Sequence, residues 1–296
     1  MRGCRRCAKP PAGNRPSTGC IHGPYSSIRS SSLEDSTWWS QVAGSSAQND
    51  RRHEAVLFDF FGTLVSIDAD RLPRRRIGGH EYIVTIHGLD ELLAEVCPNA
   101  DIETFFAALL EVSRELQETK RTDLREIPSR ERFRRTLARL GADRDSHSVA
   151  DEMSRRHMAA LADAVVCPAG RRDLLASLAE RYRLGLVSNF DDGRTVRRLL
   201  KRHRLDRPLE AVLVSDDFGK RKPGAEIFLQ ACSDLEIEPS RTLHVGDSYL
   251  EDICGATRAG LDAVWIDTGD QDPSPALARL EDVRDLPAWL AGARAG

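Results

Sequence analysis

Several chemically useful side chains each follow an apolar run of this chain. Asp59 follows the first run, Ser188 and Asn189 follow a second, Asp247 follows another, and Lys222 comes after a short polar loop. A carboxylate can attack phosphorus and form an acyl-phosphate, which divides one difficult step into two easier ones. A lysine can offset the negative charge of the transition state. These residue types therefore favour phosphoryl transfer.

The two carboxylates also suggest a metal ion. Asp59 and Asp247 would repel each other at close range unless a cation lay between them. Mg²⁺ is a hard ion that binds carboxylate oxygens together with substrate phosphate. Ser188 and Asn189 can donate hydrogen bonds to phosphate oxygens. Mg²⁺ is thus the expected cofactor, and a small phosphorylated molecule the expected partner.

A parallel sheet would bring these residues together. Residues 55–61 form a continuous apolar run, which is typical of a strand buried on both faces. After Pro168, strand-like runs alternate with helical stretches, which predicts a doubly wound parallel sheet. Ligands of such sheets bind beyond the carboxyl ends of the strands. The predicted strands after the first are 184–187, 211–214, 243–245 and 263–266.

The segment between the first strand and the rest of the sheet has a different pattern. From about Glu81 to Asp163, apolar residues recur at helical spacing, and no strand pattern is evident. The predicted fold class is α/β: a doubly wound, Rossmann-like parallel sheet with an inserted all-helical cap and a disordered N-terminal tail. The predicted boundaries are 1–52 for the tail, 54–72 plus 165–296 for the core, and 73–164 for the cap.

Composition excludes several classes of protein. The formal net charge of −3 over 296 residues gives no global signature of nucleic-acid binding. No apolar run approaches the roughly 20 residues that cross a bilayer, and no apolar signal segment is evident. We expect a cytoplasmic protein without a membrane partner. Cys4 and Cys7 form a CxxC pair, with Cys20 and His22 further on, but the second half of a zinc site lacks paired spacing.

Over about residues 54–270 the chain resembles the haloacid dehalogenase-like hydrolase superfamily, in the branch with a helical cap after the first strand. Any one of its four motifs alone is weak, but here all four occur in order, each after its own predicted strand. The matching segments are Asp59–Leu64, Leu186–Asn189, Arg221–Pro223, and His244–Ser248 followed by Asp252.

The resemblance implies a role for each matching residue. Asp59 would be the nucleophile and, with Asp247, a metal ligand, and the backbone carbonyl of Phe61 would complete the metal site. The resemblance also places Ser188 on the phosphate or leaving group, and Asp252 in a supporting position. From the residue types themselves we expect Asn189 to donate to phosphate oxygens, Lys222 to compensate charge, and Thr63 to support the site by a hydrogen bond within the turn after Asp59.

One position departs from the pattern of the phosphatases. Most phosphatases of this family carry a second aspartate two residues after the nucleophile as general acid and base, and here that position is Phe61. Loss of that proton transfer removes a contribution of typically about 10²–10⁴-fold in rate. An acid from the cap, for which His80 and His87 are candidates, or a good leaving group would compensate.

Three functions follow from this set of residues. The first is a Mg²⁺-dependent phosphatase that acts on a small phosphorylated metabolite through an aspartyl-phosphate. The alternative is a metal-independent 2-haloacid dehalogenase, since those relatives carry an aromatic residue at the position of Phe61 but lack the Gly-Asp found at Asp247. The third is a degenerate, non-catalytic member that binds a phosphorylated metabolite. Neither the substrate nor the oligomeric state follows from these patterns.

Overall fold

The central sheet has six strands, and every neighbouring pair is parallel. The computed structural model describes residues 53–142, 146–267 and 275–292, so the predicted tail over 1–52, with its CxxC pair, lies outside the described residues. In order across the sheet, the strands are β10 (Ala278–Leu280), β9 (Asp262–Ile266), β8 (Thr242–Gly246), β1 (Ala55–Phe58), β6 (Arg183–Ser188) and β7 (Ala211–Val214).

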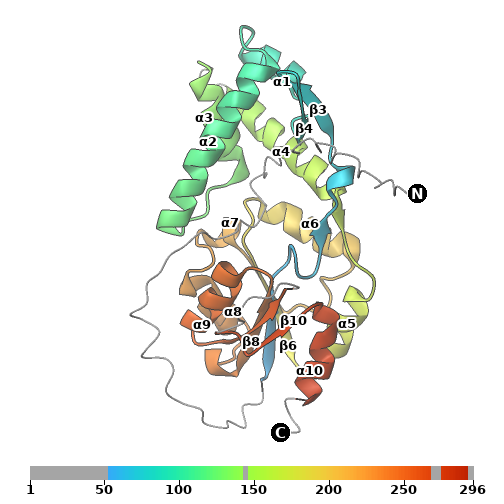
Figure 1. Ribbon diagram of the computed structural model, residues 1–296. Helices are drawn as coiled ribbons and strands as arrows, with labels where there is room; N and C mark the ends of the chain where they lie inside the picture. The colour runs from blue at the N-terminus through green and yellow to red at the C-terminus, as the bar shows by residue number, and fades with distance from the viewer. Residues whose placement is uncertain (1–52, 143–145, 268–274, 293–296) are drawn as a thin grey trace, which may run out of the picture. The chain divides into compact units, whose positions relative to one another are not determined.

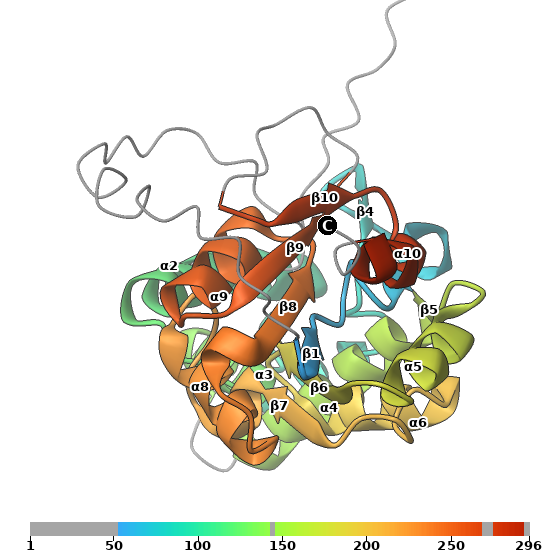
Figure 2. The same cartoon turned by 90° about the horizontal axis from the view of Figure 1, so that it is seen from below.

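Strand β1 lies in the middle of this sheet, and all four of its residues are completely buried. Helices pack on both faces, as Figure 2 shows, which explains why the strand is apolar at successive positions rather than at alternate ones. The helices of the core are α5 (Arg171–Ala179), α6 (Gly193–His203), α7 (Ser215–Phe218), α8 (Ala225–Asp234), a π-helical turn η5 (Tyr249–Cys254), α9 (Gly255–Arg258) and α10 (Leu286–Gly292).

One face of the sheet packs against α8 and α9. Leu57 of β1 and Val187 of β6 share a buried cluster with Phe228 of α8 and Ala256 of α9. Short 3₁₀ turns occur at Ala69–Arg71 (η2), Pro239–Arg241 (η4) and Val283–Asp285 (η6). The parallel strands and the helices on both faces of the sheet (Figure 2) confirm the predicted α/β class with a doubly wound parallel sheet.

The predicted helical insertion is present between β1 and β6 (Figure 1). Its apolar stripes form a separate buried cluster that includes Leu93, Phe105, Phe133 and Met153. The insertion joins the core through a short antiparallel pair, β2 (Ser66–Ile67) with β5 (Val165–Val166). Its helices are α1 (Asp90–Val96), α2 (Ile102–Asp123), α3 (Ser129–Arg139) and α4 (His147–Asp163).

The prediction that the cap is entirely helical is wrong for its first residues. Strands β3 (Arg74–Ile77) and β4 (His80–Ile83) form an antiparallel hairpin. Gly78 and Gly79 connect them with φ values of 56° and 81°, the left-handed backbone that a tight hairpin turn requires. The three arginines of β3 gave no strand pattern in the sequence. The Gly-Gly pair, however, is typical of a hairpin turn and could have indicated the two strands.

No helix within the described ranges is long and apolar enough to cross a membrane. All described residues lie in one compact unit, residues 31–296. The proposed boundaries of tail, core and cap stay predictions.

Candidate active site

Three neighbouring strands deliver the predicted site residues to one edge of the sheet. Asp59 directly follows β1, Ser188 ends β6, and Asp247 directly follows β8. Strand β1 pairs with both of the others, and its last residue, Phe58, lies opposite Val245 of β8. Because all three strands run parallel, their carboxyl ends meet at the same edge. The predicted site residues Asp59, Ser188 and Asp247 therefore lie at one edge of the sheet, as expected.

Lys222 connects Asp59 to the rest of the site. Its Nζ atom lies 2.6 Å from Asp59 Oδ1, 2.6 Å from Asp252 Oδ1 and 2.9 Å from the carbonyl oxygen of Val187. These three bonds use the full donor capacity of an ammonium group. Only 1% of the residue is exposed. Burial works against its charge, but the carboxylates of Asp252 and Asp59 raise the pKa of Lys222 above its ordinary value.

Asn189 holds the backbone of Lys222. Its Nδ2 donates to the Lys222 carbonyl at 2.9 Å, and its Oδ1 accepts from the Lys222 backbone N–H at 2.8 Å. Both ends of the amide are therefore used to position the lysine. A direct contact between Asn189 and a substrate stays a prediction that this geometry does not support.

Both carboxylate oxygens of Asp252 form hydrogen bonds. Oδ1 accepts from Lys222 and lies 2.8 Å from Nε2 of His244, while Oδ2 accepts from the Ser248 backbone N–H at 3.0 Å. Burial opposes its ionisation, but the ammonium of Lys222 and the hydrogen bond from His244 hold the pKa of Asp252 well below its ordinary value. Asp252 therefore acts in this structure as a charged anchor for Lys222.

His244 also contacts this group of residues, although it was not among the predicted site residues. It is completely buried in β8, and burial lowers the pKa of its ring, so that the neutral imidazole donates from Nε2 to Asp252. Its position three residues before Asp247, on a strand that ends at the site, was the available signal.

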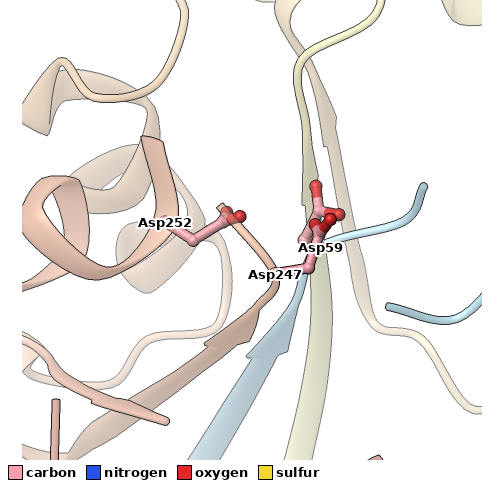
Figure 3. A group of neighbouring side chains, drawn as sticks. All are labelled: Asp59, Asp247 and Asp252. Atoms are coloured by element: carbon pink, nitrogen blue, oxygen red, sulfur yellow. The ribbon is translucent and has the colours of Figure 1, made fainter. Parts of the chain in front are cut away.

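Asp59, Asp247 and Asp252 form a cluster of carboxylates (Figure 3), with one oxygen from each within 4.8 Å of the others. Burial, together with the negative charges of Asp59 and Asp252, raises the pKa of Asp247 to about 8. Burial likewise raises the pKa of Asp59 to about 7, although the ammonium of Lys222 opposes the shift. Carboxylates that are crowded in this way are stabilised in their ionised form by a cation.

The chain leaves room for Asp247 at the turn after β1. Gly62 has a φ of +97°, and a Cβ atom at this position would lie 2.2 Å from Oδ2 of Asp247. Any larger residue at position 62 would therefore displace that carboxylate. Oxygen donors crowded against a residue without a side chain fit a small hard cation such as Mg²⁺.

Two buried hydroxyls at the site have no hydrogen-bond partner within the described part of the chain. They are Ser188 Oγ and Thr63 Oγ1. Buried polar atoms are normally paired, so the Ser188 hydroxyl at the strand end is available to a ligand. The prediction that Thr63 bonds within its turn is wrong, because backbone bonds hold that turn instead, such as Gly62 N–H to the Val65 carbonyl at 2.7 Å.

Phe61 lies beside the nucleophile position, where the resemblance led us to expect an acid. Its ring stacks on Phe190 with centroids 4.7 Å apart and an interplanar angle of 22°. The two cap histidines considered as replacements, His80 and His87, are exposed, and neither has a hydrogen bond to a site residue in the described segments. The structure thus brings no proton donor from these histidines to the site.

Comparison with known proteins agrees with this fold and site. Residues 86–266 match the model of the haloacid dehalogenase-like hydrolase family. The chain is 27% identical over 221 residues to a glyceraldehyde 3-phosphate phosphatase of Pyrococcus furiosus, which covers 74% of this chain and 82% of that relative. It is 32% identical over 168 residues to the enzyme of the same name from Methanopyrus kandleri, covering 56% of this chain and 70% of the relative.

A solved structure shows the same fold. The 2-haloacid dehalogenase of Pseudomonas syringae pv. Tomato DC3000 superposes with a TM-score of 0.62 at 24% identity, over 81% of this chain and 99% of that one. The parallel sheet with its inserted helices makes this an α/β protein, and its carboxylate cluster lies beyond the carboxyl ends of the strands, where such folds bind ligands. The chain belongs to the haloacid dehalogenase-like hydrolase family.

Proposed function

We propose that this hydrolase is a Mg²⁺-dependent phosphatase that acts on a small phosphorylated metabolite. The observation that carries the proposal is the crowding of Asp247 against Asp59, with one Lys222 ammonium beside them. A metal-free reaction has no use for a second carboxylate whose ionisation is penalised by the first. The relatives named as phosphatases support the same class of reaction.

Asp59 is the proposed nucleophile. One of its oxygens forms a bond to phosphorus as the bond from phosphorus to the leaving oxygen breaks, which gives an aspartyl-phosphate and the leaving group as an anion; an alkoxide then takes its proton from solvent water. Water then attacks the phosphorus, releases inorganic phosphate and restores the carboxylate. Lys222 contacts Asp59 throughout and offsets the negative charge that accumulates on the phosphoryl oxygens. The buried hydroxyl of Ser188 donates to one of those oxygens.

Asp59, Asp247 and the backbone carbonyl of Phe61 are the proposed Mg²⁺ ligands. The ion would neutralise charge on the substrate phosphate and keep both carboxylates ionised. Asp252 is not part of this ligand set, because Lys222, His244 and Ser248 already occupy its two oxygens.

One observation favours a second candidate, hydrolysis of 2-haloacids. Phe61 presents an aromatic ring where a phosphatase of this family would present an acid, and a halide needs no proton to leave. Asp247 argues against this candidate, since its crowded carboxylate has no use in a metal-free site. The third candidate, a binding protein without turnover, would be excluded by any turnover that depends on Asp59.

The experiment that tests the proposal is phosphate release from p-nitrophenyl phosphate and a panel of phosphorylated metabolites, with Mg²⁺ and with chelator. We expect release that falls to background in chelator and returns on addition of Mg²⁺. Halide release from 2-chloropropionate is measured in parallel. Release of halide in chelator, without release of phosphate in Mg²⁺, would contradict the proposal in favour of the dehalogenase.

Phe61→Asp is expected to increase phosphatase activity on alkyl phosphates. The new carboxyl group can protonate the leaving alkoxide, and such general acids contribute roughly 10²–10⁴-fold. Loss of the stacking contact with Phe190 will cost part of that gain, so we expect about tenfold or more in kcat. The measurement is kcat on glycerol phosphate and on p-nitrophenyl phosphate, whose leaving group needs little protonation.

Phe61→Asn is the matched control, since it has the same shape as the Asp variant and cannot donate a proton as a carboxylic acid does. Equal rates for the Asp and Asn variants on glycerol phosphate would show that no acid is missing at this position.

A further inference from the structure

A second group of buried charges lies where the cap meets the core. This group, the cap-foot cluster, includes Lys120 at the end of α2, Glu126 in the α2–α3 loop, Arg132 on α3 and Asp191 after β6. Their exposed fractions are 9%, 8%, 6% and 6%, respectively. Three of the four belong to the cap and one to the core. None of them has a role in the chemistry proposed above.

The cluster is connected by short contacts. Lys120 Nζ lies 2.6 Å from Glu126 Oε1 and 3.4 Å from Asp191 Oδ2, and Arg132 Nη2 lies 3.0 Å from the same Asp191 oxygen. On the core side, Ser215 Oγ donates to Glu126 Oε2 at 2.6 Å. Two cap cations therefore share one core carboxylate, while one cap carboxylate bonds a core hydroxyl.

Backbone hydrogen bonds connect the same cap loop to two core loops. Where this loop enters α3, the N–H of Ser129 donates to the Asp191 carbonyl at 2.8 Å, in the loop that directly follows Ser188. The Glu126 N–H donates to the Gly219 carbonyl at 3.1 Å, in the loop that leads to Lys222.

A third backbone hydrogen bond runs in the opposite direction, from a core donor to a cap acceptor. The Arg221 N–H donates to the Leu124 carbonyl at 3.0 Å, and Arg221 directly precedes Lys222. Arg221 Nη1 also lies 3.5 Å from Glu126 Oε2. The cap loop thus contacts both loops that carry catalytic groups.

A buried ion cluster of this kind is a poor source of stability. The desolvation of each charge offsets most of the attraction, and apolar residues of similar size would stabilise the fold as well. Such groups instead define geometry, because an arrangement that separates them leaves charges buried without partners. Here the geometry they define is that of the cap loop relative to the Ser188 and Lys222 loops.

We propose that Asp191 and Glu126 are positioning residues that hold the α2–α3 loop on both catalytic loops. Ser188 and Lys222 then reach their working positions only when the cap loop is engaged. This inference rests on the proposed function for its effect on turnover, but the engagement itself does not. The neighbouring Asp192 has a different role, because its Oδ1 caps α6 by accepting from the Thr195 N–H at 2.9 Å.

The test compares Asp191→Asn and Glu126→Gln with Asp151→Asn. Asp151 pairs with Arg134 at 2.9 Å within the cap, and its side chain is 49% exposed. The Asp151→Asn variant therefore removes an ion pair with an arginine that does not involve the core. Amide hydrogen exchange is measured at Glu126, Ser129 and Arg221 and, as the internal standard, in β1. We expect the first two variants to exchange roughly tenfold faster at the three contact amides, with β1 unchanged.

Kinetics provide the second measurement. On p-nitrophenyl phosphate with Mg²⁺, Asp191→Asn should lower kcat by roughly tenfold to a hundredfold, because small displacements of catalytic groups have effects of that size, with little change in KM. Asp191→Glu, which keeps the charge, should recover part of the loss. Unchanged exchange at the contact amides, or equal loss of protection in β1, would overturn the proposal. Hydrogen exchange needs no substrate. It therefore tests whether Asp191 and Glu126 hold the α2–α3 loop on the core loops even if the protein releases no phosphate.

Discussion

Asp59→Asn is expected to abolish phosphate release and to leave the fold intact. The amide cannot form the bond to phosphorus, and loss of a nucleophile costs roughly 10⁴-fold or more in kcat. The side chain keeps its shape and can still accept a hydrogen bond from Lys222, which retains Asp252 at 2.6 Å. The lysine is therefore not left without a counter-charge.

The measurement is phosphate release under saturating substrate, with thermal unfolding of the same preparation. Asp247→Asn is the comparison, since it should weaken the response to Mg²⁺ while the nucleophile remains. Activity of Asp59→Asn within tenfold of the parent, with a normal unfolding curve, would rule out the covalent mechanism.

Lys222→Met is expected to reduce both activity and stability. The lysine is 1% exposed and bonds two carboxylates, so its removal leaves Asp59 and Asp252 buried without their cation. Breaking one side of a buried pair in this way costs about 3–5 kcal/mol in the free energy of unfolding. The loss of transition-state stabilisation should lower kcat by roughly 10²–10³-fold, as removal of comparable electrostatic groups does.

The pH dependence supplies an independent readout of the same variant. In the parent, the pKa of Asp252 is lower in the folded state than in the unfolded state. The ionised carboxylate therefore stabilises the fold at pH values above the unfolded-state pKa, and this stabilisation is lost as the pH falls. Without Lys222 this pKa should rise, so the destabilisation measured by urea unfolding should shrink toward acid pH.

Lys220→Met, two residues away, is the control for the loss of a half-buried lysine charge in the same loop. A Lys222→Met variant as stable as Lys220→Met at neutral pH would show that the buried pairs contribute no stability.

Much of the core could be predicted because its signals are local. A strand buried on both faces is apolar at successive positions, and Ala55–Phe58 shows this within four residues. The rule that ligands bind beyond the carboxyl ends of parallel strands then placed Asp59, Ser188 and Asp247 together without any knowledge of contacts. The hairpin β3–β4 was missed because its strands are charged, and only its Gly-Gly turn carried a signal.

The partners of the charged groups could not be predicted. Lys222 bonds Asp59 across 163 positions and Asp252 across 30. Nothing short-range distinguishes Asp191 from Asp192, yet the first is buried against two cap cations and the second caps a helix.

By itself, then, the amino-acid sequence determined the layered α/β core, the inserted helices and the end of the sheet at which Asp59, Ser188 and Asp247 lie. Each of these depends on periodicity or on residue types within a few positions. Only the tertiary structure decided that Asn189 holds the backbone of Lys222 and that Asp252, bonded to His244, pairs with its ammonium. It also decided that a buried ion cluster connects the cap loop to the loop after Ser188. Buried charges find their partners only when distant segments pack, and the low polarity of the packed interior makes each pairing strong or costly.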